Sequence, residues 1–420
     1  IRRPPRSTQG VSSAASDVYK RQVVIAIPDS DAQYDDTSDP YVPVKGSKYA
    51  PDPSDVSAAV DLLLNSKNPL IYAGEGVIYA GASAELKAFA ELVNAPVVTT
   101  LKAKGAFPED HPLFVGVRGD QVNHYLDKCD LLFAVGSSLS PGRFSHGIPN
   151  AVSKTIVHCT IDELHVNKTY PTAQAVIGDA KFALEALSAE VSTKTSGNGC
   201  PPGNVASEVK SARDSAMIKY REAMASTDKP INPYKVYAGL MEALDPLNSF
   251  VTHESGNTRD QLSTVYDTLV PRGFLGWGNV SSLGFSFAST IAAKLAFPDK
   301  DCVAVTGEAG LGYMLGQLEV ALRQKIGITV VHVSNGGFSG YGPGFWGDGH
   351  DPFTHHVLGY DDVDMSKVIG DLGYHTERVS EPSDVVLALK RALEVNKSGQ
   401  PAYIEFICSQ FPIYGGWVGR

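Results

Sequence analysis

Short apolar segments rich in β-branched residues alternate with longer amphipathic segments over most of the 420-residue chain. Short apolar runs between turn residues are typical of buried strands, and apolar positions at helical spacing are typical of helices. In the first half of the chain this pattern predicts strands over 69–73, 96–100, 130–135 and 155–161, helices over 54–64 and 82–92, and a last helix that ends near Leu187.

The second half of the chain repeats the alternation. It predicts strands over 249–252, 301–306, 328–334 and 402–407, and helices over 234–244, 285–295, 311–325 and 383–394. Alternating strands and helices favour parallel sheets covered by helices, because each crossover helix packs back onto the sheet. We therefore expect an α/β protein with two doubly wound parallel-sheet domains.

Changes in composition mark the expected domain borders. Residues 1–22 lack apolar periodicity and an initiator methionine, and we interpret them as a non-native leader that resembles translated adaptor sequence. An apolar run at 23–27 and the Asp-, Pro- and Tyr-rich stretch to residue 53 read as a final strand and a linker. The remaining expected units are a domain over 54–188, a linker over 189–232 with one helix at 205–225, and a domain over 233–420.

Charge and cysteine content narrow the class of protein. A formal net charge of −10 argues against a nucleic-acid-binding surface, since such surfaces are basic. The five cysteines have no paired spacing and most lie in or beside apolar segments, which is typical of reduced thiols. The apolar runs are far shorter than a membrane span requires. We expect a soluble, cytoplasmic protein with no nucleic-acid or membrane partner.

One acidic residue and one asparagine follow two consecutive predicted strands. Glu308 comes after the strand at 301–306, and Asn335 comes after the strand at 328–334. A right-handed crossover brings both strand ends to the same sheet edge, where open α/β sheets bind ligands. Carboxylate, amide and diphosphate oxygens together suit Mg²⁺. Gly310 and Gly312 open the next helix, whose N-terminal amides favour an anion nearby. An ordinary turn in a strand–helix–strand unit explains these residues equally well.

The sequence around these two residues resembles the diphosphate- and metal-binding motif of thiamine diphosphate (ThDP, or thiamine pyrophosphate) enzymes. Within that family it is most similar to the acetolactate synthase-like decarboxylases and carboligases. The motif reads Gly-Asp-Gly, a helix and a strand, then Asn-Asn, and the matching positions here are 307–309 and 334–335. The resemblance implies that Glu308, Asn335 and the main-chain carbonyl of Gly337 bind Mg²⁺.

Three positions depart from the family motif. Glu308 replaces the usual Asp, so the turn or the position of the ion must accommodate an additional methylene group. Ala309 replaces the second Gly and restricts the backbone of the turn. Ser334 replaces the first Asn, which is not the metal-binding one in the family.

The resemblance implies further contacts with the cofactor. Residues 255–257 match the loop that contacts the diphosphate, and Leu283 matches the bulky apolar residue that holds the two cofactor rings in a V shape. A generic strand-end turn and plain core packing are the alternative explanations. The cofactor-binding residues implied by the resemblance are Ser255, Gly256, Asn257, Ser282, Leu283, Gly307, Glu308, Ala309, Gly310, Asn335, Gly337 and Phe338.

The resemblance also assigns the domains. Residues 23–53 would close a pyrimidine-binding domain, 54–188 would be the central Rossmann-like domain, and 233–420 would bind the diphosphate and Mg²⁺. The central domain carries FAD in some members, and residues 114–120 and 135–138 fall where nucleotide-contacting loops lie, so FAD stays open here.

Two other motifs have competing interpretations. Gly74-Glu75-Gly76 is part of a dinucleotide-binding pattern, but Tyr79 stands where the pattern has a third glycine, which favours a structural turn. The loop at 336–349 is rich in glycine and aromatic residues, which suits a lid over a site or a surface loop. The cluster of Asp348, His350, Asp351, His355 and His356 lacks a regular ligand spacing, which favours a solvated loop over a metal site.

Members of the family decarboxylate a 2-oxo acid or join it to a second carbonyl compound. They need an activating Glu from the pyrimidine-binding domain of a second subunit, and no segment of this chain matches the stretch that carries it. The resemblance therefore implies a homodimer or homotetramer for the full-length protein, and a chain that alone binds ThDP poorly and is inactive. Pyruvate is the default substrate, and oxalyl-CoA-like and aromatic 2-oxo acids stay open. A non-catalytic ThDP-fold homologue, or a nucleotide-binding oxidoreductase that uses the turn at 74–76, remains open.

Overall fold

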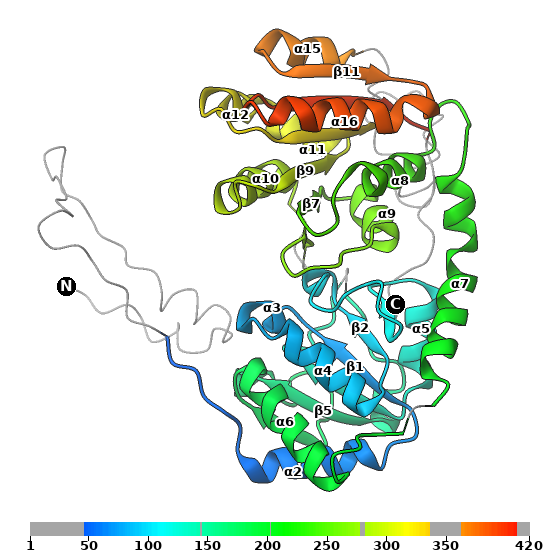
Figure 1. The fold of residues 1–420 in the computed structure, drawn as a ribbon, viewed down its shortest axis with the longest axis vertical. Coiled ribbons are helices and arrows are strands. Elements are labelled where there is room, and N and C mark those ends of the chain that lie inside the picture. The colour runs from blue at the N-terminus through cyan, green and yellow to red at the C-terminus, as the bar shows by residue number, and fades with distance from the viewer. Residues whose placement is uncertain (1–45, 143–144, 202, 278–281, 337–362, 410–420) are drawn as a thin grey trace, which may run out of the picture.

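The computed structural model describes residues 46–142, 145–201, 203–277, 282–336 and 363–409. The expected leader at 1–22 and the expected strand at 23–27 lie outside the described residues. In the described part of the chain, two α/β domains lie one above the other along the long axis of the molecule (Figure 1). All five cysteines are free, as their spacing predicts.

The first domain is built on a six-stranded parallel sheet in the order β3-β2-β1-β4-β5-β6 within the described residues. This is the strand order of a Rossmann-type sheet, and it confirms the expected doubly wound class. The strands are β1 (Pro69–Ala73), β2 (Val97–Thr99), β3 (Phe114–Gly116), β4 (Leu131–Val135), β5 (Thr155–Thr160) and β6 (Gln174–Ile177). The helices are α2 (Pro53–Leu64), α3 (Gly76–Ala80), α4 (Ser83–Val93), α5 (Asp120–Lys128) and α6 (Ala180–Lys194), with 3₁₀ turns at Leu101–Ala103, Ala151–Ser153 and Glu163–His165.

Strand β1 shows how the sequence produces the layers of this domain. Ile71 and Ala73 belong to the apolar cluster that contains buried residues of α2, α4 and α6, whereas Leu70 and Tyr72 belong to the cluster on the side of α5. Successive strand residues point to opposite faces, so a strand covered on both sides reads as a continuous apolar run.

The structure corrects three details of the first domain. The helix at 54–64 begins at Pro53, because the side chain of Asp52 accepts the N–H of Ser54 at 2.7 Å and is the capping group. Helix α6 continues to Lys194, so the start of the expected linker at 189 is helical. The first three residues of the expected nucleotide loop at 114–120 form strand β3.

The second domain also contains a six-stranded parallel sheet in the described residues, in the order β11-β12-β10-β9-β7-β8. Its strands are β7 (Ser249–His253), β8 (Phe274–Leu275), β9 (Asp301–Thr306), β10 (Thr329–Ser334), β11 (His375–Val379) and β12 (Ala402–Ile407). Its helices are α8 (Pro233–Ala243), α9 (Asn257–Val265), α10 (Phe285–Ala296), α11 (Glu308–Met314), α12 (Glu319–Arg323), α15 (Met365–Leu372) and α16 (Val385–Asn396), with 3₁₀ turns at Leu315–Gln317 and Pro382–Asp384.

The expected single helix over 311–325 is wrong in two respects. Helix α11 already begins at Glu308, and the 3₁₀ turn separates it from α12. Met314 and Leu318 still face the apolar core, as their spacing predicts. The early start matters, because it places Glu308 in the first turn of a helix.

Helix α7 (Val205–Met224) connects the two domains and lies beside both of them (Figure 1). It packs against α5 and β3 of the first domain and against α8 of the second. Within the described residues, none of the helices has the length and apolar character that crossing a membrane requires.

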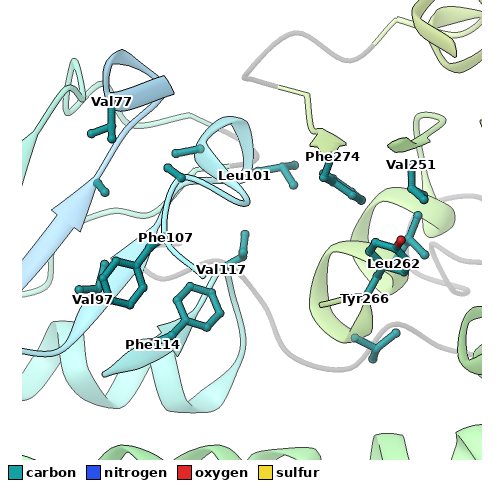
Figure 2. Close-up of a cluster of buried hydrophobic side chains, with 14 of the residues drawn as sticks. Val77, Val97, Leu101, Phe107, Phe114, Val117, Val251, Leu262, Tyr266 and Phe274 are labelled. Carbon is teal, nitrogen blue, oxygen red and sulfur yellow. The ribbon is translucent and has the colours of Figure 1, made fainter. Parts of the chain in front are cut away.

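The two domains share one apolar cluster. Figure 2 shows Leu101 of the first domain facing Phe274 of the second. A Cβ atom on Gly276 would lie 2.4 Å from the carbonyl oxygen of Leu101, so glycine is required for this close approach. The interface is therefore closely packed.

A buried ion pair lies at the same interface. Lys104 and Glu109, which are 2% and 1% exposed, contact each other, and Glu109 Oε2 also accepts the N–H of Thr268 in the second domain at 3.0 Å. The N–H of Glu109 donates to the carbonyl of Thr268 at 3.2 Å. Burial raises the pKa of Glu109 to about 7, although Lys104 acts to lower it.

Replacing Glu109 tests this pKa. A carboxyl group with a raised pKa in the folded protein contributes stability that is fully present below its ordinary pKa of 4.5 and is lost as the pH rises through about 7. Between about pH 5 and about pH 8, the free energy of unfolding should therefore fall by roughly 2–3 kcal/mol more for the natural protein than for Glu109→Gln. Urea denaturation at each pH measures this difference. Parallel curves for the two proteins would contradict the raised pKa.

Candidate functional site

Four segments of the second domain meet at the carboxyl edge of its sheet. They are the turn after β7 at 254–257, the start of α10, the turn from β9 into α11, and the residues after β10. Strands β7 and β9 are neighbours in the sheet. From β7 the chain continues to β8 at one edge of the sheet, whereas from β9 it continues to β10 in the direction of the opposite edge. In open α/β sheets such a switch point is where ligands bind.

The structure brings Glu308 and Asn335 together. Glu308 Oε1 accepts the main-chain N–H of Asn335 at 2.5 Å and that of Gly336 at 2.9 Å, and the Glu308 side chain is buried. The Oδ1 atom of Asn335 is itself buried and has no hydrogen-bond partner within the described residues. A buried acceptor without a partner is costly, so this oxygen suits a partner that the described residues do not supply. A hard cation such as Mg²⁺ fits this donor set of oxygens.

The turn after β7 leads into the start of helix α9. Gly256 adopts φ 101°, a left-handed conformation that favours glycine, and it is the N-cap of the helix. The Oδ1 atom of Asn257, in the first helical position, is also buried without a partner in the described structure. The unpaired N–H groups of a helix start favour an anion, so the expected diphosphate loop at 255–257 has suitable chemistry.

Glu254 is a buried carboxylate whose role the sequence did not reveal. Its Oε2 accepts the N–H of Ser286 at 3.2 Å and the hydroxyl of Ser286 at 2.8 Å, and its Oε1 accepts the N–H of Ser255 at 3.0 Å. It therefore links the turn after β7 to the first turn of α10. Burial raises the pKa of Glu254, and these hydrogen bonds act against that rise.

Glu254 also explains a glycine in the first turn of helix α11. A Cβ atom on Gly310 would lie 2.0 Å from Cγ of Glu254 and 2.6 Å from Oγ1 of Thr306. Ala309, by contrast, is an ordinary helical residue of α11, so the helix accommodates the loss of the family's second glycine. Gly307 is extended, with φ −110°, and is the N-cap of that helix.

The remaining expected site residues divide into two groups. Ser282 and Leu283 lie directly before α10, where Ser282 is exposed and Leu283 is half-buried. Gly337, Phe338, the expected lid beyond Gly336 and the cluster of Asp and His residues at 348–356 lie outside the described residues. The part of the chain that the structure describes holds no group of three or more His, Cys, Asp or Glu side chains arranged to bind a metal ion.

The turn at 74–76 in the first domain has a structural explanation. A Cβ atom on Gly74 would lie 2.4 Å from the carbonyl oxygen of Gly136, which follows the neighbouring strand β4. Next to it lies a cavity of about 480 Å³, lined among others by Glu75, Ser137, Asp162 and Trp277. Gly136, Ser137 and Ser138, within the expected nucleotide loop at 135–138, line this cavity.

The loop at 114–120 contacts the second domain. Arg118 in this loop forms an ion pair with Asp260 of helix α9, in the other domain, with Nη1 and Oδ1 3.0 Å apart. The sequence contains one signal for a residue such as Arg118: it is a charged residue in a glycine-containing loop directly after a buried strand. It gave no sign of the partner.

A doubly wound sheet whose edge combines an open helix start with a buried carboxylate and asparagine is the arrangement of α/β proteins that bind phosphate-containing ligands. Comparison with known proteins identifies the family. Residues 56–187 match the central domain of thiamine pyrophosphate enzymes, and residues 254–406 match their C-terminal TPP binding domain. Together these matches cover more than half of the chain, and it belongs to the thiamine pyrophosphate enzymes.

Individual relatives agree with this assignment. The chain is 32% identical to a probable acetolactate synthase large subunit of Methanocaldococcus jannaschii, over 66% of this chain and 47% of that protein. It is 27% identical to acetolactate synthase isozyme 3 large subunit of Escherichia coli, over 67% of this chain and 49% of that protein. It is 26% identical to 2-hydroxyacyl-CoA lyase of Arabidopsis thaliana, over 90% of this chain and 65% of that protein. The chain thus spans about half the length of the two synthase subunits, and none of these names favours an oxidoreductase.

Two glycines of helix α11 provide a matched test of the site geometry. Gly310→Ala should destabilise the protein by about 1–3 kcal/mol, because the new methyl group overlaps Glu254. Gly312→Ala should instead stabilise it by roughly 0.5–1 kcal/mol, because a Cβ atom there meets nothing within 4 Å and alanine favours the helix. Thermal unfolding of both variants measures the difference. Equal effects at the two positions would show that Glu254 does not fill the space beside Gly310.

Proposed function

We propose that the second domain binds the diphosphate of ThDP together with Mg²⁺, and that the whole protein decarboxylates or ligates a small 2-oxo acid. The observation that carries this proposal is the contact between Glu308 and the main chain of Asn335, beside a buried Asn335 oxygen without a partner in the described structure. Membership of the thiamine pyrophosphate enzymes supports it.

Each part of the proposed site has a distinct task. Glu308, Asn335 and the main-chain carbonyl of Gly337 would hold Mg²⁺. Ser255 and the N–H groups of Gly256 and Asn257 would bind the diphosphate. Leu283 would support the rings of the cofactor. When bound, ThDP supplies a nucleophilic carbon for attack on the carbonyl of the 2-oxo acid.

The chain's own residues would orient the cofactor and exclude water. The hydrogen bonds from Asn335 and Gly336 fix the Glu308 carboxylate before the metal arrives, so little reorganisation is needed on binding. Glu254 would keep the turn after β7 and the start of α10 in a fixed relation, through its bonds to Ser255 and Ser286. An activating Glu is expected from a pyrimidine-binding domain of a second subunit, which implies a homodimer or homotetramer.

Pyruvate is the first substrate to test, since two of the relatives are named acetolactate synthase. Decarboxylation and carboligation are distinguished by whether CO₂ release from pyruvate is accompanied by a joined product. A ThDP-binding homologue without catalysis would bind the cofactor and release no CO₂. Flavin absorbance of the purified protein tests whether the cavity in the central domain holds FAD.

Replacing Glu308 tests the metal site. Glu308→Gln should weaken Mg²⁺-dependent ThDP binding by about 10- to 100-fold, the scale that even supporting groups of a metal site reach. Isothermal titration with ThDP in the presence and absence of Mg²⁺ measures this change.

The control is Glu319→Gln, which removes an exposed carboxylate that pairs with Arg323 in the neighbouring helix α12. This variant should bind ThDP like the natural protein. ThDP binding that is independent of Mg²⁺, or equally weak in both variants, would contradict the proposed metal site.

A further inference from the structure

A buried cluster of charges joins the central domain to the helix that begins at the proposed diphosphate site. Arg118 and Arg259 are 2% and 1% exposed, and both bind the carboxylate of Asp260, which is 7% exposed. Arg118 Nη1 lies 3.0 Å from Asp260 Oδ1. Arg259 contacts both oxygens of the same carboxylate, at 2.7 Å from Nε and 2.9 Å from Nη2. One carboxylate is thus shared by two guanidinium groups from different domains.

The Arg118–Asp260 contact lies where it can fix the orientation of the first turn of α9. Asp260 is in the first turn of α9, and its N–H points back to the carbonyl of Gly256, the N-cap, at 3.4 Å. Residues 255–257 directly precede or begin this turn. A buried bidentate or shared ion pair holds its partners in a narrow range of geometries, because every alternative leaves a charge unpaired away from water.

Other contacts between the domains involve parts of the second domain outside the first turn of α9. Glu109 binds the main chain of Thr268, beyond the end of α9, and Leu101 packs against Gly276. They hold the domains together without contacting the first turn of the helix. Arg118, from the central domain, does reach this turn.

We propose that Arg118 is a positioning residue for cofactor binding: through Asp260, the central domain fixes the first turn of α9 and so aims the N–H groups of Gly256 and Asn257 at the diphosphate. This inference rests on the proposed function. It gives the central domain a part in the cofactor site of the other domain, in addition to its own cavity.

A direct electrostatic role makes a different prediction. Two arginines and one aspartate leave one net positive charge near an anion site, which could attract diphosphate without any positioning. Removing Arg118 lowers this charge, and removing Asp260 raises it. Positioning requires that both changes weaken binding, whereas simple attraction requires that they act in opposite directions.

The experiment compares Arg118→Gln, Asp260→Asn and the double variant in the complete protein. Each single variant should weaken binding of ThDP with Mg²⁺ by about tenfold, and the double variant should bind like the single ones, because coupled neighbours are not additive. Leu101→Ala is the control, since it weakens the same domain interface away from α9. It should lower the melting temperature and leave ThDP affinity within about twofold.

Hydrogen–deuterium exchange without cofactor gives a second, independent measurement. Arg118→Gln should speed amide exchange at 256–260, and Leu101→Ala should not. Arg118→Lys keeps the charge but lacks the planar guanidinium group, so its amides at 256–260 should exchange more slowly than those of Arg118→Gln. If Arg118→Gln fails to fold, Arg118→Lys replaces it in the comparison.

Tighter ThDP binding in Asp260→Asn, or unchanged exchange at 256–260 in Arg118→Gln, would overturn the inference. Loss of affinity in Leu101→Ala equal to that in Arg118→Gln would also overturn it, since general docking would then explain the effect. If exchange changes as expected but the natural protein binds no ThDP, the positioning of the turn stands and the proposed function fails.

Discussion

The hydrogen bonds from the main chain of Asn335 and Gly336 to the Glu308 carboxylate are the interaction on which the proposed site depends. They exist because β9 and β10 are adjacent parallel strands, paired from Val303–Thr329 to Thr306–His332, so that both carboxyl ends lie at the same edge of the sheet. Glu308 carries one methylene group more than the aspartate of the family motif. In this structure the longer side chain of Glu308 reaches the main chain after β10. This contact explains how the turn accommodates the substitution.

The two domains are more closely connected than two similar sheets joined by a linker need to be. They share an apolar cluster, a buried Lys–Glu pair and a carboxylate bound by arginines of both. Buried ion pairs add little net stability over apolar packing, but they are specific, because a displaced partner leaves an unpaired charge. The interface therefore defines one arrangement of the domains, and that arrangement includes the helix start at the sheet edge.

The features that sequence analysis predicted correctly have a common physical basis. Strands β1, β4, β9 and β12 lie in sheet interiors with both faces covered. Their sequences are apolar runs, interrupted only by one acidic residue each in β9 and β12, and such runs are easily recognised. The positions of Glu308 and Asn335 after β9 and β10 followed from this alternation and from the hand of the crossover. Their roles came from the resemblance to a family rather than from the pattern.

The features that were missed lack such a signal. Helix α9 is buried but largely polar, with Thr258, Arg259, Asp260 and Gln261 all inside, so it has little apolar periodicity. Strands β3 and β8 have three and two residues, too few for a pattern. The ion pair of Arg118 and the fit of Glu254 against Gly310 join residues far apart in sequence, and a single chain does not reveal such partners.

The fit between Glu254 and Gly310 constrains how this sheet edge can change over evolution. A side chain at 310 needs the volume that the Glu254 methylene groups occupy, so a relative with alanine there should carry a shorter residue at 254. Such a replacement would also release Ser286 from its acceptor. Three positions on three different segments would then have to diverge together, and an alignment of relatives should show them as one correlated set.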